Sequence, residues 1–290
     1  MPRSDRLPAR LPRLLVDRAV AAALEEDLGL AGDLTSQAVL APEARATASL
    51  SAREPGIIAG LDLAAAAFRL VGDGVSFSPA VADGAPVAAG DVVATVTGPA
   101  RLVMSAERVA LNFLNHLSGI ATLTRAYADA VAGTGAQICD TRKTTPGLRA
   151  FQKYAVRCGG GANHRYGLGD AILIKDNHIA VAGSVTAAYQ AAEAFAGHLV
   201  AIEIEVTTLA ELDEALTAGA KVVLLDNMGN DLLRQAVAIN AGRAKLEASG
   251  GVKLDRVRSI GETGVDYIST SQITMAATPL DLGLDVIVER

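Results

Sequence analysis

Six short apolar segments in the second half of the chain constrain its fold more than any other feature. Each ends in ionisable or small polar residues, and the six are AQICDTRK, AILIKD, LVAIEIEV, KVVLLDN, KLEASGG and DYIST. Glu205, Asp226, Ser249 and Ser271 follow one another at intervals of 21 to 23 residues, which suits a compact strand–helix unit. Apolar strands that alternate with helices pair in parallel through right-handed crossovers. The pattern predicts an α/β barrel.

Amphipathic helices are predicted between the later segments. Thr208 and Glu211 have the spacing of a capping box, and Gly219 marks the end of that helix. Two further helices are predicted to begin at Asp231 and Asp255. Because chemistry in α/β barrels collects at the carboxyl ends of the strands, we expect the polar residues there to form the functional site.

The first third of the chain has a different sequence pattern. A helix is predicted within the first thirty residues, before Asp33. From there to about Ala100, short Val-rich runs separated by glycines predict strands and hairpins. The stretch from Glu107 to Val131 predicts one or two helices with a break at Gly119, and we place the main domain boundary near its beginning.

Composition excludes several classes of protein. The 290-residue chain has a net charge of −6, and its five Phe, five Tyr and no Trp leave few platforms for stacking bases, so nucleic-acid binding is not expected. No apolar run approaches the roughly 18–20 residues that span a bilayer. Asp17 and Arg18 interrupt the apolar stretch near the N-terminus, so a secretion signal is not expected. Cys139 and Cys158 lack metal or disulfide spacing, which favours a cytoplasmic protein.

A cationic segment lies inside this acidic chain. Residues 140–176 carry seven Lys or Arg against three Asp, a net +4, so the remainder carries −10. Such a zone favours a multiply charged anionic ligand. The residues that we assign to a solvated helix face are Arg149, Lys153 and Arg157. Those that stand at strand ends, and that we assign to a binding site, are Arg142, Lys143 and Lys175.

Two carboxylates, Glu205 and Asp226, are predicted at neighbouring strand ends. They would repel each other unless a cation or hydroxyl donors lay between them, and Mg²⁺ with a phosphorylated sugar supplies both. Ion pairs with Lys175 and Arg165 are the alternative, and the two interpretations are compatible. Glu203 shares a strand face with Glu205, so which of them faces the pocket stays open; we choose Glu205 because it lies nearer the carboxyl end of the strand.

Small residues follow the last two strands. Ser249-Gly250-Gly251 and Thr270-Ser271-Gln272 leave backbone N–H groups free to bind a phosphate, which commonly lies at this place in α/β barrels. Gly159–Gly161 is interpreted instead as a flexible connection, and His178 as a buttress for Lys175.

The run DTRKTTPGLRAFQKYAVRCGGGANHRYGLGDAILIKDNH, Asp140–His178, closely resembles quinolinate phosphoribosyltransferases. The resemblance continues through EDLGLAGDLTS, REPGIIAG, ERVALNFLNHLSGIAT, IEIEV, LLDNM, EASGGV and PLDLGLDV. It implies a mixed α/β N-terminal domain (1–112, joined by 275–290) and an open, type II phosphoribosyltransferase-like barrel of parallel strands (113–274). It also implies transfer of phosphoribose from phosphoribosyl pyrophosphate to quinolinate, with decarboxylation to nicotinate mononucleotide, a precursor of NAD.

The resemblance also implies roles for individual residues. Those that would bind quinolinate are Thr141, Arg142, Lys143, His164, Arg165 and Lys175. Glu205 and Asp226 match carboxylates that contact the ribose and Mg²⁺, while Ser249–Gly251 and Thr270–Gln272 match the 5′-phosphate site. Those expected to act in catalysis are Lys143, Lys175, Glu205 and Asp226. Arg108 matches an arginine supplied by the neighbouring subunit, which implies a homodimer or a higher homo-oligomer.

Ser271 departs from the family pattern, where many relatives show Gly. Three alternatives also remain. Lys175 at a strand end suits a Schiff-base lyase, and the same scaffold suits a non-catalytic anion sensor, although the two carboxylates disfavour a purely anionic ligand. A relative of the family that is encoded beside molybdate transport genes shares the core motif, but the full cationic set argues against it.

Overall fold

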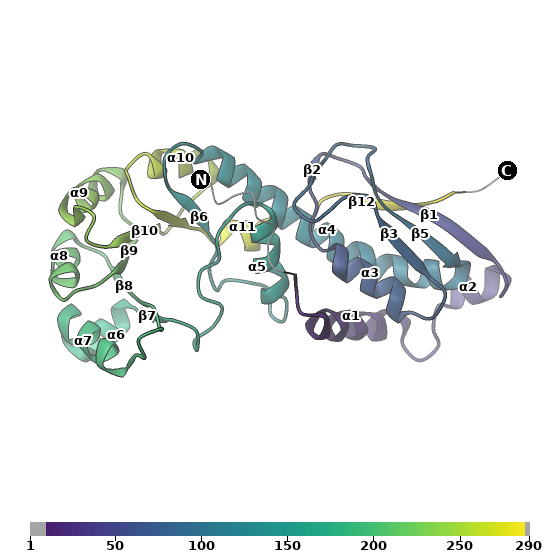
Figure 1. Cartoon of the computed structure of the whole chain (residues 1–290), viewed down its shortest axis with the longest axis horizontal. Helices are drawn as coiled ribbons and strands as arrows, with labels where there is room; N and C mark the ends of the chain where they lie inside the picture. The colour runs from purple at the N-terminus through teal and green to yellow at the C-terminus, as the bar shows by residue number, and fades with distance from the viewer. Residues whose placement is uncertain (1–9, 288–290) are drawn as a thin grey trace. The chain divides into compact units, whose positions relative to one another are not determined.

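The computed structural model describes residues 10–287 (Figure 1), so residues 1–9 and 288–290 of the expected N-terminal domain lie outside the described residues. Contacts group the chain into two units, one with residues 1–123, 151–160 and 277–290, the other with 124–150 and 161–276. This division differs from the expected boundary at 112/113. One continuous helix, Ala100–Ala130, runs through both the expected boundary and the observed one at 123/124.

The first unit is built on a four-stranded antiparallel sheet in the order β12-β1-β5-β3. Its strands are β1 (Arg45–Ala52), β3 (Ser76–Pro79), β5 (Val92–Pro99) and β12 (Leu282–Ile287). A two-stranded pair, β2 (Gly56–Ile57) and β4 (Pro86–Val87), accompanies it. Strand β12 comes from the end of the chain and pairs antiparallel with β1, from Thr47 opposite Ile287 to Ala52 opposite Leu282.

The first unit also contains helices that the sequence analysis did not all anticipate. Helix α1 (Arg13–Leu28) confirms the predicted N-terminal helix. Helices α2 (Leu34–Val39) and α3 (Leu61–Leu70), however, lie in the region that was expected to hold only strands and turns, so that expectation was wrong. Helix α3 is Ala-rich and six of its ten residues are buried, so Asp62 and Arg69 are the only charged residues that mark its outer side.

Helix α4 (Ala100–Ala130) is a single helix, so the predicted break at Gly119 was also wrong. Glycine is needed here because the backbone of the segment that returns to the first unit packs closely against the helix. A Cβ atom at Gly119 would lie 2.1 Å from the carbonyl oxygen of Thr278. One turn earlier, the N–H of Leu280 donates to the carbonyl of Asn115 at 2.9 Å. Among residues 10–287, no helix is both long and apolar enough to cross a membrane.

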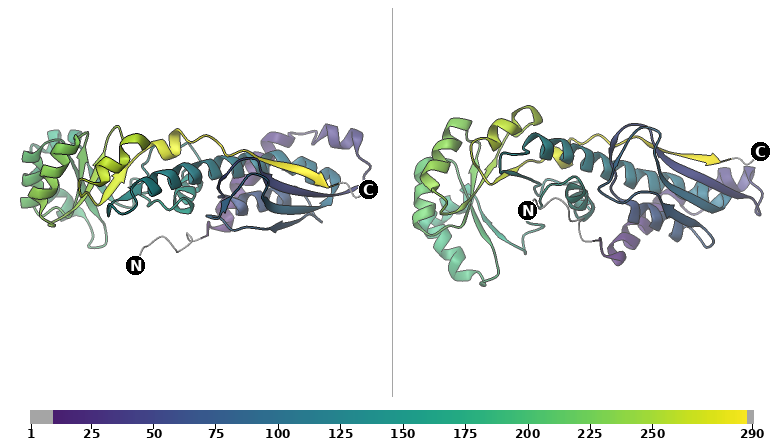
Figure 2. Two further views of the ribbon diagram at one scale, coloured as in Figure 1. Left: turned by 90° about the horizontal axis from the view of Figure 1, so that it is seen from above. Right: turned by 45° about the horizontal axis from the view of Figure 1, so that its top comes forward.

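The second unit is a six-stranded sheet in the order β6-β11-β10-β9-β8-β7, in which every neighbouring pair is parallel. The strands are β6 (Gln137–Cys139), β7 (Ile172–Ile174), β8 (Ile202–Val206), β9 (Val222–Asp226), β10 (Lys245–Ser249) and β11 (Tyr267–Ser269). Figure 2 shows this sheet curved, with helices along its outer face. Since β6 and β7 are its two edges, the barrel is open, and all six predicted strands are confirmed.

Helices connect the barrel strands. They are α6 (Asp176–Ala182), α7 (Val185–Phe195), α8 (Leu209–Thr217), α9 (Asn230–Asn240), α10 (Leu254–Gly261) and the short α11 (Gln272–Met275). The predicted capping box is present, since the N–H of Glu211 donates to the Thr208 hydroxyl at 3.2 Å and the Thr208 N–H donates back to the Glu211 carboxylate at 3.1 Å. Helices α9 and α10 each begin one residue before the predicted start.

Helix α5 (Arg149–Cys158) corrects one further expectation. Lys153 is fully buried rather than solvated, and Arg149 is half-buried. The helix has buried residues almost all round, so its basic residues do not form one exposed face.

Candidate active site

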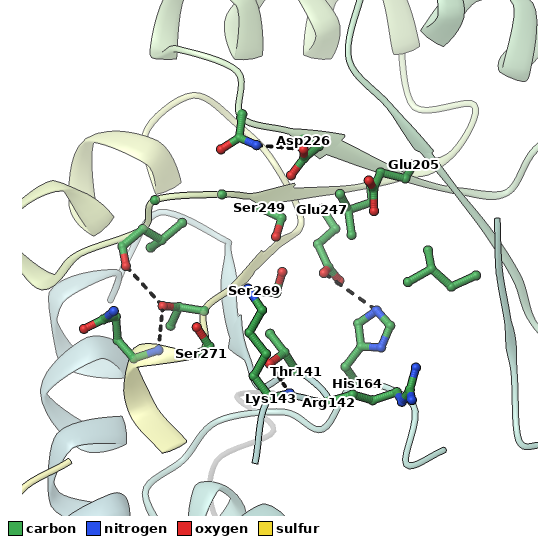
Figure 3. A pocket seen from close by; sticks show the side chains of 18 of the residues that line it. Thr141, Arg142, Lys143, His164, Glu205, Asp226, Glu247, Ser249, Ser269 and Ser271 are labelled. Atoms are coloured by element: carbon green, nitrogen blue, oxygen red, sulfur yellow. Dashed lines mark hydrogen bonds and ion pairs between the residues drawn. The ribbon is translucent and has the colours of Figure 1, made fainter. Parts of the chain in front are cut away.

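A cavity of about 670 Å³ opens at the carboxyl ends of the barrel strands. Every site residue predicted from the sequence within residues 124–276 lines it: Thr141, Arg142, Lys143, His164, Arg165, Lys175, Glu205, Asp226, Ser249, Gly250, Gly251, Thr270, Ser271 and Gln272. Arg108 does not line it, but is exposed on α4 in the other unit. Figure 3 shows Arg142 and Lys143 reaching into the cavity from one side, with the carboxylates on strands at the other.

Strand geometry brings residues far apart in the sequence to one face. Asp226 and Ser249 are direct neighbours across β9 and β10, and Glu205 lies beside Leu224 across β8 and β9. Because side chains alternate along a strand, residues two positions apart share a face. Thus Glu247 lies beneath Ser249 on the same strand, one layer further into the barrel.

The loop after β6 carries the cationic wall of the cavity. Its backbone is pinned from both sides: Arg149 donates to the carbonyl of Arg142 at 3.3 Å, and the Thr274 hydroxyl donates to the carbonyl of Lys143 at 2.8 Å. Arg149 also donates to the Thr144 hydroxyl at 3.0 Å, so it supports the loop instead of lying on a solvated face. The loop is therefore rigid while its cationic side chains face the cavity.

Two guanidinium groups in this wall have buried donors without a protein acceptor. The Nε atoms of Arg142 and Arg165 are both buried and have no hydrogen-bond partner within residues 10–287. Burial, followed by the nearby Arg142 charge, lowers the pKa of Arg165. Neither guanidinium forms an ion pair with a carboxylate among the described residues, so the charge of both is available to an anionic ligand in the cavity.

Lys175 is held at both its backbone and its side chain. Its N–H donates to Nδ1 of His178 at 2.9 Å, which confirms the predicted buttress. Its ammonium nitrogen lies 2.8 Å from Oε2 of Glu205, so the ion pair expected between them is present. The ion pair expected for Arg165 with Glu205 or Asp226 is absent from the described residues; its Nη1 donates to the Ala171 carbonyl at 3.0 Å.

The structure shows which of Glu203 and Glu205 faces the cavity. Glu205 lines the cavity, whereas Glu203 is buried in the layer beneath it. Glu203 accepts a hydrogen bond from Nε2 of His164 at 2.8 Å, and Glu247 lies with Oε1 3.8 Å from the same nitrogen. Burial raises the pKa of Glu247 to about 7, and the neighbouring Glu203 carboxylate adds to the rise.

His164, Glu203 and Glu247 are residue types that bind metals, and their ligand atoms lie within 4.8 Å of one another. The backbone N–H of Arg165 donates to Nδ1 of His164 at 2.8 Å, which places the ring proton on Nε2. That proton points at Glu203, so the imidazole acts here as a hydrogen-bond donor and not as a metal ligand. The trio forms the buried floor of the cavity.

The turn after β10 lines the cavity. Gly250 and Gly251 have φ values of 94° and 59°, a region that favours glycine. Thr270 braces the turn, since its hydroxyl donates to the carbonyl of Val252 at 3.1 Å and accepts from the N–H of Gln272 at 3.2 Å. Ser271 is the N-cap position of α11 and also lines the cavity.

Sequence reasoning missed several lining residues: Leu173, Leu224, Asn227, Glu247, Val252, Lys253 and Ser269. Glu247 stands two residues before Ser249, so the period-two pattern of a strand contained the signal. Asn227 and Lys253 come directly after predicted site residues or turns. Both line the cavity, but the strand pattern by itself does not mark them as lining residues.

An open parallel α/β barrel with unsatisfied guanidinium donors, opposing carboxylates and a glycine turn at its strand ends defines an anion-binding barrel enzyme of the phosphoribosyltransferase type. Family models match both parts of the chain: quinolinate phosphoribosyl transferase, N-terminal domain, over residues 33–118, and the C-terminal domain over 120–285. The chain belongs to the quinolinate phosphoribosyltransferase family.

Individual relatives agree with this assignment. The chain is 46% identical over 269 residues to the nicotinate-nucleotide pyrophosphorylase [carboxylating] of Mycobacterium leprae, with 91% of this chain and 94% of that protein covered. It is 44% identical over 261 residues to the probable nicotinate-nucleotide pyrophosphorylase [carboxylating] of Bacillus subtilis, with 90% of each covered. The crystal structure of NadC from Streptococcus pyogenes superposes with a TM-score of 0.92 at 40% identity, covering 97% of this chain and 100% of that one.

Proposed function

We propose that this chain transfers the phosphoribosyl group of phosphoribosyl pyrophosphate to the ring nitrogen of quinolinate. The products are nicotinate mononucleotide, pyrophosphate and carbon dioxide, and the reaction serves de novo NAD biosynthesis. One observation carries the proposal: Arg142 and Arg165, which form no ion pair with a carboxylate among residues 10–287, share a cavity with Glu205 and Asp226. A dianionic pyridine matches the first pair, and a sugar with several hydroxyls matches the second.

The cationic wall is the quinolinate subsite. Arg142 and Arg165 offer planar forks that suit carboxylates, and Lys175 adds a mobile point charge. Thr141 and Lys143 complete this side of the cavity. The ion pair with Glu205 keeps the Lys175 ammonium directed into the cavity before quinolinate arrives.

The acidic wall and the two turns are the subsite for the activated sugar. Glu205 and Asp226 contact the ribose hydroxyls, and the 5′-phosphate lies against Ser249–Gly251 and Thr270–Gln272. Two carboxylates beside a phosphate-rich substrate form a donor set that suits Mg²⁺, which prefers carboxylate and phosphate oxygens. When bound, Mg²⁺ supplies positive charge to the pyrophosphate oxygens. Glu205 and Asp226 are the residues that would hold it, directly or through water or substrate.

No covalent nucleophile is needed. The lone pair of the ring nitrogen forms the new bond to the anomeric carbon while the bond to pyrophosphate breaks, so positioning and electrostatic stabilisation supply most of the rate. The 2-carboxylate then leaves as carbon dioxide. Its bonding electrons remain on the ring carbon beside the positively charged nitrogen, and this carbon takes up a proton.

The assembly is a homodimer at least, in which Arg108 of one subunit reaches the quinolinate subsite of the other. The family resemblance and the exposure of Arg108 on α4 support this arrangement. The enzyme acts in the cytoplasm. The two cysteines support that compartment, since Cys139 and Cys158 are both buried and form no disulfide with each other.

The experiment that tests the function is a release assay with quinolinate labelled in its 2-carboxylate. Labelled carbon dioxide should appear only when phosphoribosyl pyrophosphate and Mg²⁺ are both present, together with nicotinate mononucleotide in equal amount. A purified protein that releases no label overturns the proposal. Borohydride treatment with substrate provides a second arm, because covalent trapping on Lys175 would indicate a Schiff-base lyase instead.

A further inference from the structure

Asn227, the residue directly after β9, has an unusual backbone conformation. Its φ is 56°, and Ala241 is the only other non-glycine residue with positive φ among residues 10–287. Ala241 has an ordinary explanation, because it is the C-cap of α9. Asn227 caps no helix, since the N-cap of α9 is Gly229. A positive φ is uncommon for residues other than glycine, although asparagine adopts it more readily than most.

This conformation lets Asn227 make one contact on each side. Its side-chain Nδ2 donates to Oδ2 of Asp226 at 2.7 Å, and its backbone N–H donates to the carbonyl of Ser249 at 2.9 Å. The first contact fixes one oxygen of the acidic wall. The second ties the residue to the strand that leads into the glycine turn, and Figure 3 shows the hydrogen bond to Asp226 at the rim of the cavity.

The side chain of Asn227 also lies against Gly250. A Cβ atom at Gly250 would meet Oδ1 of Asn227 at 2.2 Å and its backbone nitrogen at 2.9 Å. The turn therefore needs glycine partly because the carboxamide of Asn227 occupies the space of a side chain. The carboxamide of Asn227 thus contacts both Asp226 and the Gly250 turn, and Asn227 lines the cavity together with them.

We propose that Asn227 is a positioning residue for the phosphoribosyl pyrophosphate half of the site. It orients the Asp226 carboxylate and fixes the position of the Gly250 turn relative to Asp226. The inference rests on the proposed function. Asn227 does not contact the cationic wall in any hydrogen bond of the described residues. Its effect is accordingly confined to the sugar substrate.

Two substitutions separate positioning from mere backbone support. Asn227→Gly accepts the left-handed conformation and removes the carboxamide, while Asn227→Asp keeps the shape but replaces the donor with an acceptor beside Asp226. We expect both to raise the KM for phosphoribosyl pyrophosphate at least roughly fivefold, because a hydrogen bond to a charged group is lost. The KM for quinolinate should stay within about twofold, and Asn227→Asp should have the larger effect because it adds like charge.

Ala241→Gly is the matched control, since it changes the other positive-φ residue at a position outside the cavity; both of its KM values should be unchanged. A second readout needs no turnover: Mg²⁺ with phosphoribosyl pyrophosphate should raise the melting temperature of the wild type more than that of either Asn227 variant. Equal changes in both KM values, or unchanged protection, would overturn the inference. A wild type that releases no labelled carbon dioxide would instead overturn the proposed function, which keeps the two failures apart.

Discussion

The ammonium nitrogen of Lys175 lies 2.8 Å from Oε2 of Glu205, so an ion pair joins the cationic and the acidic walls of the cavity. The lysine follows β7 and the glutamate belongs to β8, which is the neighbouring parallel strand. The side chain of Lys175 is 47% exposed and that of Glu205 is 11% exposed. The lysine of this pair is therefore in contact with solvent, and the pair contributes little to the stability of the fold.

Replacing Lys175 with Met should reduce kcat/KM for quinolinate by about 100-fold or more, since a charge in contact with a carboxylate is lost. The free energy of unfolding should change by no more than about 1 kcal/mol, because one partner is well exposed. Steady-state kinetics and urea unfolding measure the two effects. Lys245→Met is the matched control: Lys245 pairs with Asp266 at 2.6 Å near the start of β10, away from the cavity, and its loss should leave kinetics unchanged.

Replacing Arg142 with Gln should raise the KM for quinolinate more than it slows decarboxylation of the bound intermediate. Arg142 holds the ground-state carboxylate, whereas the positive ring nitrogen stabilises the electrons left when carbon dioxide departs. Steady-state kinetics give the KM, and single-turnover release of labelled carbon dioxide gives the later step. Equal losses in both measurements would contradict this division of roles.

Stability should depend on pH through Glu247. Its pKa is raised in the fold from 4.5 to about 7, so the folded protein binds the proton more tightly than the unfolded chain. The resulting stabilisation is complete below about pH 4.5, falls as the pH rises, and is lost above about pH 7; its full size is roughly 3 kcal/mol. Glu247→Gln cannot ionise, so its unfolding free energy relative to wild type should rise across this window.

Urea unfolding at several pH values from 4.5 to 8 measures the difference between wild type and Glu247→Gln. Glu43→Gln provides the control, because Glu43 is exposed. A difference that stays constant with pH would show that Glu247 has the same pKa in the folded and unfolded states, which would contradict the prediction.

Replacing Gly119 with Ala should destabilise the first unit by about 1–3 kcal/mol, because the new methyl group collides with backbone that cannot move independently. The collision is with the carbonyl oxygen of Thr278 at 2.1 Å. Gly197→Ala is the control, since a Cβ there meets nothing within 4 Å. Urea unfolding should separate the two variants clearly, and similar stabilities would show that the returning segment gives way.

Where a local pattern sufficed, the sequence predicted structure correctly. The six barrel strands and the Thr208–Glu211 capping box depend on short-range periodicity and spacing, and each is present. Helix α3 was missed because its ten residues offer only two charged positions, Asp62 and Arg69, to mark an amphipathic pattern. Gly119 was misinterpreted as a helix break because its partner, Thr278, lies 159 positions further along the chain and leaves no local trace.

The sequence alone supplied the chemical groups of the site: basic residues after two strands, carboxylates at the ends of two more, and turns of small or polar residues after the last two. Tertiary structure determined which of these groups line the cavity and which groups contact one another. It placed Glu205 in the cavity and Glu203 beneath it, paired Lys175 with Glu205, and brought Asn227 against Gly250. The reason is physical, since burial depth and hydrogen-bond partners depend on which strands become neighbours, and that is a property of the folded sheet and not of any single segment.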